Sequence, residues 1–467
     1  MAIGMLTQRF QDAATKAENA SLKMHRVVHG AADESISTEG GLVPSLLKWY
    51  ADLNDRTSGA VGLVEARVET LETEVVRKVQ IKTALGDSDE DTISQKAVSQ
   101  AIANIQQQQG SDLSKISMIS AGLLKLDNQS TCIIKTGPST VSIKAGTLVV
   151  NKDWVMEAVT DAEVAMPATL NAGENYGVWA LPDGSLVSTE APTDAGPYNW
   201  GSAPAIGAVL IGGFHYSLTA PATTPASGLF STTGFDNTGG NYIWTQERID
   251  RIAGINEFSI WDLTFRPKKL GLKGFAFDAE TQIWAGIYFC GANHIEDGPS
   301  KAGTNVASGT VLPKIPFAYG GDGLTNYGAC SWYTASEIAQ SHGCRLFDYN
   351  EFSSAMFGVT EKQSLGGPAS TIPLTLRQPG YTSRIGVEQA TGHQYTWGGD
   401  TSGAGGSSWV GGPNRGDSYG NTYAQLFGGY RGSAANSGSR LVLWNYVAWL
   451  SNWSTGLRAA CDHLMPV

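Results

Sequence analysis

Close cysteine pairs, long apolar runs and an excess of basic charge are all missing from this chain of 467 residues. The net charge of −11 argues against nucleic acid or an anionic membrane as the partner, because both attract basic surfaces. Without an apolar run of about 20 residues, the chain is not expected to insert into a membrane. The first residues also lack the basic and apolar regions of an export signal.

Metal-ligand patterns are equally scarce. The cysteines show no C-x-x-C spacing, which favours buried free thiols over a zinc site or a disulfide framework. The five are Cys132, Cys290, Cys330, Cys344 and Cys461. His25 and His29 have a metal-compatible spacing on one helix face, but no third ligand is near them, and His215, His294, His342 and His393 are isolated in the sequence. Asp322 and Asp400 lie in glycine-rich loops that suit either a structural calcium or an ordinary turn, so we expect no cofactor and leave metal content open.

Composition indicates a loop-rich, largely β protein of extracellular type. Charged residues are few, at 16%, and glycine is abundant, at 56 residues. A chain of this length has room for two to four domains, since domains usually contain roughly 100–200 residues. We predict an α+β, multidomain chain with a helical N-terminal part, an all-β middle module and a mixed C-terminal domain.

The N-terminal part carries helical patterns. Residues 5–27 place apolar residues at helical spacing, and residues 37–49 predict a loop leading into a helix. Residues 61–75 repeat valine and leucine at alternating spacings of three and four, which predicts a short coiled coil. A capping box at Thr92 begins another helix. We therefore predict helices over 1–60 and a coiled-coil neck with a helix over 61–110.

Short strands and turns predict a β-rich module over 115–235, and residues 242–467 predict a mixed domain. In the latter we expect helices at 245–252, from a capping box at Thr334 to Gly343, and from Asp348. Phe352, Ala355 and Met356 are expected to face the core. Strands are expected at 258–267, 275–277, 283–289 and 345–347.

The last forty or so residues have an unusual composition. From Tyr430 to Thr455 the chain contains no Lys, Asp or Glu, and its only charges are Arg431 and Arg440. Tyrosine, tryptophan, asparagine, serine and glycine dominate, and binding loops use these residues because rigid aromatic rings give contact area at low entropic cost. We expect Trp444 in the core, among Leu441, Val442 and Leu443. Arg440 and Arg458 are expected to hold loops by bonding carbonyls or Asp462.

Three anchor segments flank these residues: Leu426-Phe427-Gly428-Gly429, Ser437-Gly438-Ser439-Arg440 and Gly456-Leu457-Arg458-Ala459-Ala460-Cys461. At this spacing the anchors resemble the variable region of the phage major tropism determinant family. That resemblance, which weakens towards residue 115, implies a C-type-lectin-like domain over 242–467 with a variable region of about 430–455. It also implies a homotrimer, and a receptor-binding tail-fibre protein whose loops are rewritten by a diversity-generating retroelement.

Carried over by spacing, the resemblance also implies which residues contact the receptor on a solvent-facing surface. They are Tyr430, Gly432, Ser433, Ala434, Asn436, Leu443, Asn445, Tyr446, Leu450, Asn452, Ser454 and Thr455. The alternation of Leu450, Asn452 and Ser454 suits an extended segment, in which every second residue points the same way. The chain departs from the family at Arg431, where the family has an aromatic residue, and at 447–449, where it has Gly-Pro-Ser.

The implied role is to adsorb a virion to a host-surface protein or glycan. The implied partners are further copies of the chain and, through residues 1–60, other tail or baseplate proteins. One alternative is a structural fibre protein without receptor contact. Another is a glycan-active or formylglycine-generating enzyme, but Cys461 follows Cys344 without a nearby partner in sequence, and residues 401–461 contain one acid, Asp417. Adjacent side chains do not converge, so 461–463 is not expected to form a catalytic triad.

Overall fold

The computed structural model describes residues 35–38, 41–44 and 122–464, except 126, 152–153, 193–195, 222–241, 367–373, 404–407 and 411–417. The chain divides into two compact units, Met1–Ile105 and Gln106–Val467. The described part of the first unit is an antiparallel hairpin of β1 (Ser35–Thr38) and β2 (Gly41–Pro44), where a loop and helix were expected. The coiled coil predicted at 61–75 and the pair His25 and His29 lie outside the described residues.

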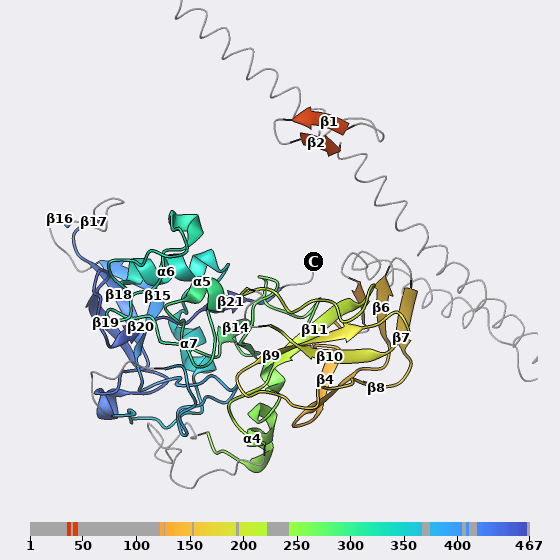
Figure 1. Cartoon of the computed structure of the whole chain (residues 1–467). Helices are drawn as coiled ribbons and strands as arrows, with labels where there is room; N and C mark the ends of the chain where they lie inside the picture. The colour runs from red at the N-terminus through yellow and green to blue at the C-terminus, as the bar shows by residue number, and fades with distance from the viewer. Residues whose placement is uncertain are drawn as a thin grey trace, which may run out of the picture. The chain divides into compact units, whose positions relative to one another are not determined.

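The second unit begins with short antiparallel strands in three small sheets, of orders β3-β6-β7, β4-β5-β8 and β10-β9-β11-β12 (Figure 1). Their bounds are β3 Leu123–Leu124, β4 Ile133–Gly137, β5 Thr140–Ile143, β6 Thr147–Asn151, β7 Trp154–Ala158, β8 Ala162–Glu163, β9 Asn175–Ala180, β10 Leu186–Glu190, β11 Val209–His215 and β12 Trp261–Asp262. Val141, Val178 and Phe214 are fully buried in their common core. The β-rich character expected for this region is therefore present.

The early strands share a core with later residues instead of closing on themselves. Strand β12 pairs with β11, and the Trp261 ring packs edge-on against Trp200 at 4.9 Å. Next to it, the buried Asp262 carboxylate accepts hydrogen bonds from Lys125 Nζ at 2.6 Å and from the Cys132 amide at 2.7 Å. A buried charge is stable only when paired and hydrogen-bonded, so this ion pair ties the two regions together. The domain limits at 235 and 242 remain a prediction.

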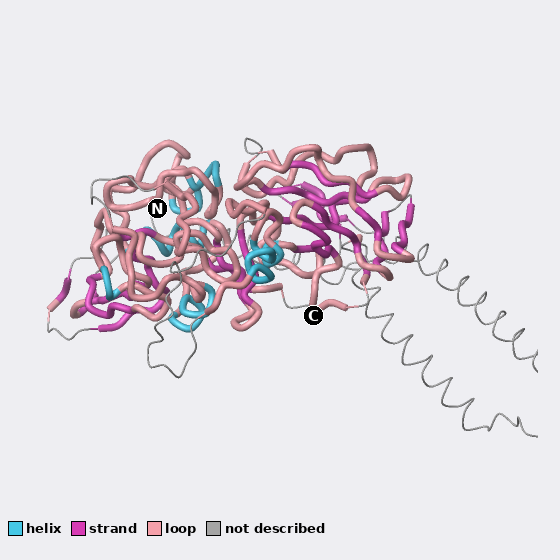
Figure 2. The backbone as a smooth tube through the Cα atoms, turned by 90° about the horizontal axis from the view of Figure 1, so that it is seen from below, coloured by secondary structure: helices cyan, strands magenta, loops and turns pink. Residues whose placement is uncertain are grey.

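Few helices are present, and loops make up most of the backbone among the described residues, as Figure 2 shows in pink. The helices are α4 Gln246–Ile252, α5 His294–Asp297, α6 Trp332–Ser341 and α7 Tyr349–Ala355, with 3-10 turns at Glu257–Ser259, Phe317–Tyr319 and Ala434–Asn436. Helix α7 begins after Asp348 and buries Phe352, Ala355 and Met356, as predicted, and Asp348 and Glu351 form a capping box at its start.

Three predictions for this region are wrong in detail. Helix α6 begins at Ser331, whose side chain accepts from the Thr334 amide, three residues before the expected start. Thr334 and Glu337 make no capping box, because Ser331 is the cap and both residues lie inside the helix. The Glu337 carboxylate instead accepts a hydrogen bond from the Tyr327 hydroxyl at 2.6 Å. Residues 258–267 form a 3-10 turn and the short β12 instead of one strand, and 345–347 make isolated bridges to Ala460 and Gly398.

Two further sheets carry the C-terminal residues (Figure 1). One has the order β13-β14-β21, and the other has the order β19-β18-β15-β20, so β19 is an edge strand. The bounds are β13 Phe275–Asp278, β14 Ile283–Gly286, β15 Tyr395–Gly403, β18 Thr422–Phe427, β19 Val442–Val447, β20 Thr455–Gly456 and β21 Ala460–Asp462, with a separate hairpin of β16 Trp409–Val410 and β17 Ser418–Tyr419. Strand β20 runs parallel to β15, which brings residue 455 beside residue 395.

All five cysteines are buried free thiols, as the sequence predicted. Two of them lie close together although they are far apart in the sequence. The bridge between Arg345 and Ala460 places Cys344 and Cys461 at facing positions. Burial raises the pKa of the Cys344 thiol, which disfavours the reactive thiolate. No helix in the described part of the chain is both long enough and apolar enough to cross a membrane.

Candidate functional site

The first anchor positions the loop that follows β18. Leu426 and Phe427 are fully buried, and Gly428 and Gly429 both have left-handed backbone angles, with φ of 80° and 87°. Side chains are also excluded by space, because a Cβ at 428 would lie 2.9 Å from the Phe352 ring and one at 429 would collide with Ser437. Glycine is required at both positions for conformation and for close packing. The chain therefore leaves the core at one defined point before Tyr430.

The second anchor is held by Glu361, a residue that sequence analysis did not single out. Its carboxylate accepts hydrogen bonds from the Ser439 amide at 2.9 Å and from the Ser439 hydroxyl at 2.5 Å. A Cβ at Gly438 would collide with the same carboxylate. Burial raises the pKa of Glu361 although both bonds from Ser439 lower it. The Ser-Gly-Ser segment is thus explained by its contact with one half-buried acid.

The third anchor depends on Arg458, which is fully buried. Its Nη1 donates to the carbonyls of Gly286 and Ile287 at 2.8 and 2.6 Å, and its Nη2 donates to those of Glu388 and Gln389 at 2.8 and 3.4 Å. Burial lowers its pKa to about 9. The prediction of a structural role through carbonyls is confirmed for Arg458. Asp462 instead pairs with Arg345, and Arg440 is exposed, so the structural role expected of Arg440 is wrong.

Four aromatic rings gather where these anchors meet, and we call Tyr395, Tyr430, Tyr446 and Trp453 the aromatic cluster. Ring centroids are 5.1 Å apart for Tyr395–Tyr430, 6.1 Å for Tyr395–Tyr446 and 5.6 Å for Tyr430–Trp453. Tyr395 is buried, whereas the other three rings are half-buried. Such offset and edge-on pairs hold aromatic side chains in fixed orientations. Nothing in the sequence pointed to Tyr395, because it is brought here by the parallel pairing of β15 with β20 and by the bridge between His393 and Tyr430.

A β-bulge turns two residues of β19 outward. Ala424 pairs with Tyr446 and Leu426 pairs with Leu443, so Trp444 and Asn445 together lie opposite the single residue Gln425. A bulge of this kind re-aims side chains from the regular alternation. Trp444 is 49% exposed and Asn445 is exposed, so the expectation that Trp444 lies in the core is wrong. Trp444 was not in the implied contact set, yet it is the most protruding ring of the face.

The structure brings together most of the implied receptor-contact residues. Four of them are exposed: Gly432, Ala434, Asn436 and Asn445. Five are half-buried: Tyr430, Leu443, Tyr446, Leu450 and Asn452. Three are buried, and for them the expectation of solvent exposure is wrong: Ser433, Ser454 and Thr455. We use "the face" for the exposed and half-buried residues between 430 and 453, including Trp444.

Local hydrogen bonds explain the three buried residues. The Ser433 hydroxyl accepts from the Tyr430 amide at 3.0 Å and donates to the Tyr395 hydroxyl at 3.2 Å. The alternation expected at 450–454 fails, because these residues form a turn in which the Asn452 side-chain oxygen accepts from the Ser454 amide at 3.3 Å. The Thr455 hydroxyl donates to the Asn452 carbonyl at 3.0 Å. Asn452 therefore stabilises the turn in addition to any contact it makes with a receptor.

A cavity of about 560 Å³ opens on the face. Its walls come from the chain at Glu361 and Lys362, from Tyr395, and from the loop between Tyr430 and Leu443. Arg440 lies at the same cavity. Segments distant in sequence thus meet at one concave site beside the aromatic cluster.

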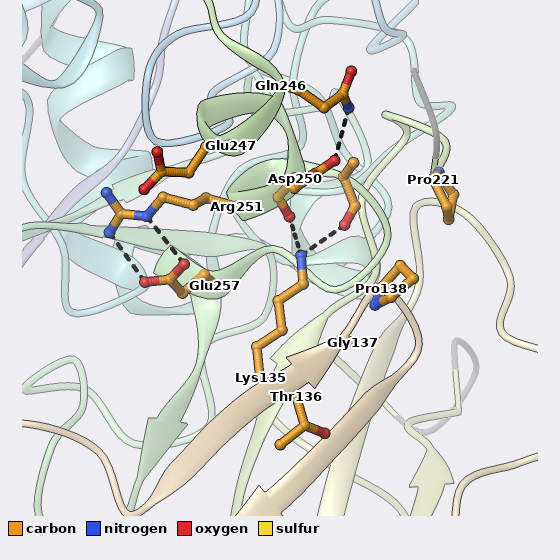
Figure 3. Close-up of a pocket in the computed structure, with 11 residues that line it drawn as sticks. Lys135, Thr136, Gly137, Pro138, Pro221, Gln246, Glu247, Asp250, Arg251 and Glu257 are labelled. Atoms are coloured by element: carbon orange, nitrogen blue, oxygen red, sulfur yellow. Dashed lines mark hydrogen bonds and ion pairs between the residues drawn. The ribbon is translucent and has the colours of Figure 1, made fainter. Parts of the chain in front are cut away.

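A larger open pocket, of about 900 Å³, lies between the β4–β5 hairpin and α4 (Figure 3). Lys135 Nζ donates to the Asp250 carbonyl and, at 2.8 Å, to the Ala253 carbonyl at the end of α4. Arg251 forms two 3.0 Å bonds with Glu257, drawn as dashed lines in Figure 3. Cations at a helix C-terminus stabilise its free carbonyls. Both cations therefore serve the fold, and this pocket is not the candidate site.

Neither metal binding nor catalysis gains support from the described residues. Asp322 accepts from the amides of Leu324 and Thr325 and from the Thr325 hydroxyl, and these bonds lower its pKa to about 2. No group of three or more potential ligands is assembled within the described residues. In 461–463, the Asp462 carboxylate bonds Arg345 at 3.0 Å, and His463 Nδ1 accepts from the Trp284 indole at 3.0 Å, so the three side chains do not converge.

Two histidines that look isolated in sequence are in contact. His294 Nδ1 lies 2.9 Å from His342 Nε2, and the opposite His342 nitrogen lies 2.6 Å from the Tyr198 hydroxyl. Burial lowers the pKa of both histidines, that of His342 to about 3. Their separation of 48 positions in the chain left no signal by which sequence analysis could pair them.

The Glu361 anchor gives a first prediction. Glu361→Gln should lower the free energy of unfolding by about 1–3 kcal/mol. The Ser439 amide and hydroxyl each donate to one carboxylate oxygen, and the glutamine side chain has only one oxygen to accept them. Urea unfolding measures the loss, and hydrogen exchange at the Ser439 amide should accelerate. Glu280→Gln, at an exposed position, is the matched control and should stay within about 0.5 kcal/mol of the parent. Equal stability of the two variants would contradict the assigned role of Glu361.

The fold and the site together define a mostly β protein whose C-terminal anchors display an aromatic face free of acidic residues. Comparisons agree. Residues 131–244 match the family model described as the Mtd second domain. The chain is 35% identical over 368 residues to the tail fiber receptor-binding protein of Bordetella phage BPP-1, covering 76% of this chain and 88% of that protein.

Solved structures of major tropism determinant variants are also similar. The U1 variant is 34% identical, with a TM-score of 0.62 over 76% of this chain and 88% of that one. The I1 variant is 33% identical, with a TM-score of 0.62 over 73% and 86%. The chain therefore belongs to the major tropism determinant family.

Proposed function

We propose that this chain is the receptor-binding protein of a phage tail fibre and that the face adsorbs the virion to a host-surface receptor. The observation that carries the proposal is the combination of rigid anchors with an exposed, acid-free aromatic loop surface. Binding surfaces need side chains that give area without a large entropic cost, and the anchors supply that rigidity. The relative named as a tail fiber receptor-binding protein and the solved tropism determinant support the same role, which is not enzymatic.

The finer architecture belongs to the same proposal. We infer a C-type-lectin-like C-terminal domain and a homotrimer in which the coiled coil predicted at 61–75 is a neck between larger parts, with residues 1–60 attached to other tail proteins. Each face then binds weakly, but several identical faces act together. Linked binding sites raise overall avidity roughly 10²–10⁴-fold when their geometry permits simultaneous contact. Modest affinity at each face is therefore sufficient for adsorption.

The face is tested best at Trp444 and Asn445. Tyr446 packs against Tyr395, and Asn452 holds a turn, so their removal would also disturb the scaffold. The double change Trp444→Ala and Asn445→Ala removes exposed groups only. Adsorption of virions carrying it should fall at least about tenfold, because a central tryptophan commonly contributes 2 kcal/mol or more.

Phe317→Ala is the matched control, since it removes a similarly exposed ring from the 3-10 turn at 317–319, outside the face. It should adsorb like the parent, and far-ultraviolet circular dichroism and the midpoint of urea unfolding should be unchanged in both variants. Normal adsorption by the double variant would rule out the face as the receptor contact.

Diversification by a retroelement is a separate part of the proposal and has its own test. The genome that encodes this chain should contain a near-copy of the segment for residues 430–461 beside a reverse-transcriptase gene. The two copies should differ mainly where the near-copy has adenine. Differences spread evenly over all bases would exclude active diversification while leaving receptor binding untouched.

A further inference from the structure

The charges around the cavity on the face are unlike those of the chain as a whole. The chain carries a net charge of −11, yet residues 430–455 contain no acid. Lys362 and Arg440 both line the cavity. The acid that lines it, Glu361, already accepts two hydrogen bonds from Ser439. The cavity is thus a local positive site on an acidic protein.

Arg440 is the cation best placed for a ligand. It is exposed, and its guanidinium makes no hydrogen bond or close ion pair among the described residues, although its charge lowers the pKa of the Glu361 carboxyl in the same cavity. The backbone beneath it is held in place, because Ser439 is bonded to Glu361 and the Arg440 carbonyl accepts from the Tyr349 hydroxyl at 3.3 Å. A guanidinium presents paired donors that match a carboxylate or phosphate in two-point contact.

The remaining walls suit a sugar ring. Tyr430 offers a half-buried aromatic surface, and Asn436 offers an exposed amide. Ring faces pack against the apolar side of a pyranose, while amide and hydroxyl groups bond its hydroxyls. The cavity volume of about 560 Å³ lies within the range of small-molecule sites, roughly 300–1,000 Å³. A protein receptor would instead be expected to spread its contacts over the whole face.

We propose that this cavity binds an anionic sugar unit of the host surface, with Arg440 pairing with its carboxylate or phosphate and Tyr430 packing against its ring. The inference rests on the proposed receptor-binding function and specifies the chemistry of the ligand. Complementary charge also raises the rate of encounter, and this effect weakens as salt screens exposed charges. Arg440 thus sets the charge preference of the face.

Direct binding to the full-length chain tests the inference, with galacturonic acid and glucose 6-phosphate as probes and galactose and glucose as their neutral counterparts. Saturation-transfer NMR and calorimetry should show at least one anionic probe binding about tenfold or more tighter than its neutral counterpart. Raising the ionic strength from about 0.05 to about 0.3 M should weaken that binding several-fold. The two anionic probes separate a carboxylate from a phosphate ligand.

Arg440→Glu should abolish the preference for the anionic probe. Lys268→Glu is the matched control, because it makes the same charge change at an exposed residue outside the cavity and should leave binding unchanged. Equal binding of charged and neutral probes, no binding of any probe, or an equal effect of both variants would overturn the inference. Adsorption that is lost with the Trp444 and Asn445 changes but unaffected by Arg440→Glu would overturn the anionic ligand while upholding the face as the receptor contact.

Discussion

Acidification from pH 6.5 to pH 4.5 is expected to lower the free energy of unfolding by about 2–3 kcal/mol per pH unit. His215, His342 and His393 are buried, and burial lowers the pKa of each from 6.5 to about 3. In this pH window each stays neutral in the folded chain but binds a proton when unfolded. Because the unfolded state binds more protons, stability is present above pH 6.5 and is lost as the pH falls.

Glu388 acts in the opposite direction. Burial raises its pKa from 4.5 to about 7, so between these values it is protonated in the folded chain and ionised in the unfolded one. Acid therefore relieves the cost of burying its charge, and stability from this group rises as the pH falls. Burial also lowers the pKa of His294 and His463 and raises that of Glu174 and Glu361, and these two pairs act in opposite directions. The remaining three histidines and one carboxyl leave a net difference of about two protons, which sets the slope. The total loss of roughly 5 kcal/mol is a large part of the 5–15 kcal/mol typical of a folded domain.

Urea unfolding at intervals of pH measures this slope. His215→Gln should make it shallower by about 1.4 kcal/mol per pH unit, because one proton is removed from the balance. Glu388→Gln should make it steeper, since the opposing group is lost. A free energy of unfolding that stays constant over this window, or rises towards acid, would contradict the neutral state assigned to the buried histidines.

Arg458→Met should lower the free energy of unfolding by about 4 kcal/mol or more. The guanidinium donates to four buried carbonyls, and the Ile287 carbonyl also accepts from the Glu388 amide at 2.9 Å. Each acceptor left without a donor costs about 1–3 kcal/mol. It also lies over the Phe289 ring at 4.4 Å, and methionine would lose that attraction. Arg458→Lys should recover only part of the loss, because a single ammonium cannot reach carbonyls on both sides.

Arg440→Met is the internal control for that measurement. The same side chain is replaced at an exposed position, so the free energy of unfolding should change by less than about 0.5 kcal/mol. Chemical denaturation of both variants gives the comparison directly. A loss below about 1 kcal/mol for Arg458→Met would show that the carbonyls find other donors.

Local patterns predicted the features that depend on neighbouring residues. The helices predicted from Asp348 and at 245–252 are present, because caps satisfy backbone groups a few residues away. The β-rich character of the middle region also followed from short alternating strands and turns. The composition of 430–455 indicated a displayed loop surface, and Asn436 and Asn445 are indeed exposed.

Long-range contacts decided the rest. The parallel pairing of β15 with β20 adds Tyr395 to the aromatic cluster, and Glu361 reaches Ser439 across 78 positions. Trp444 was misplaced because an apolar neighbourhood predicts burial, whereas the bulge opposite Gln425 turns it outward. Ser454 and Thr455 were misplaced because a turn held by Asn452 replaces the expected alternation.

By itself, then, the sequence determined where the anchors are, which residue types lie between them and that acids are absent there. These properties follow from the order of residues along the chain and do not require the tertiary structure. Tertiary structure alone decided which of those residues reach solvent and which distant groups, Glu361, Lys362 and Tyr395, form the cavity with them. The physical reason is that exposure and concavity depend on strand register and on contacts between segments far apart in the chain.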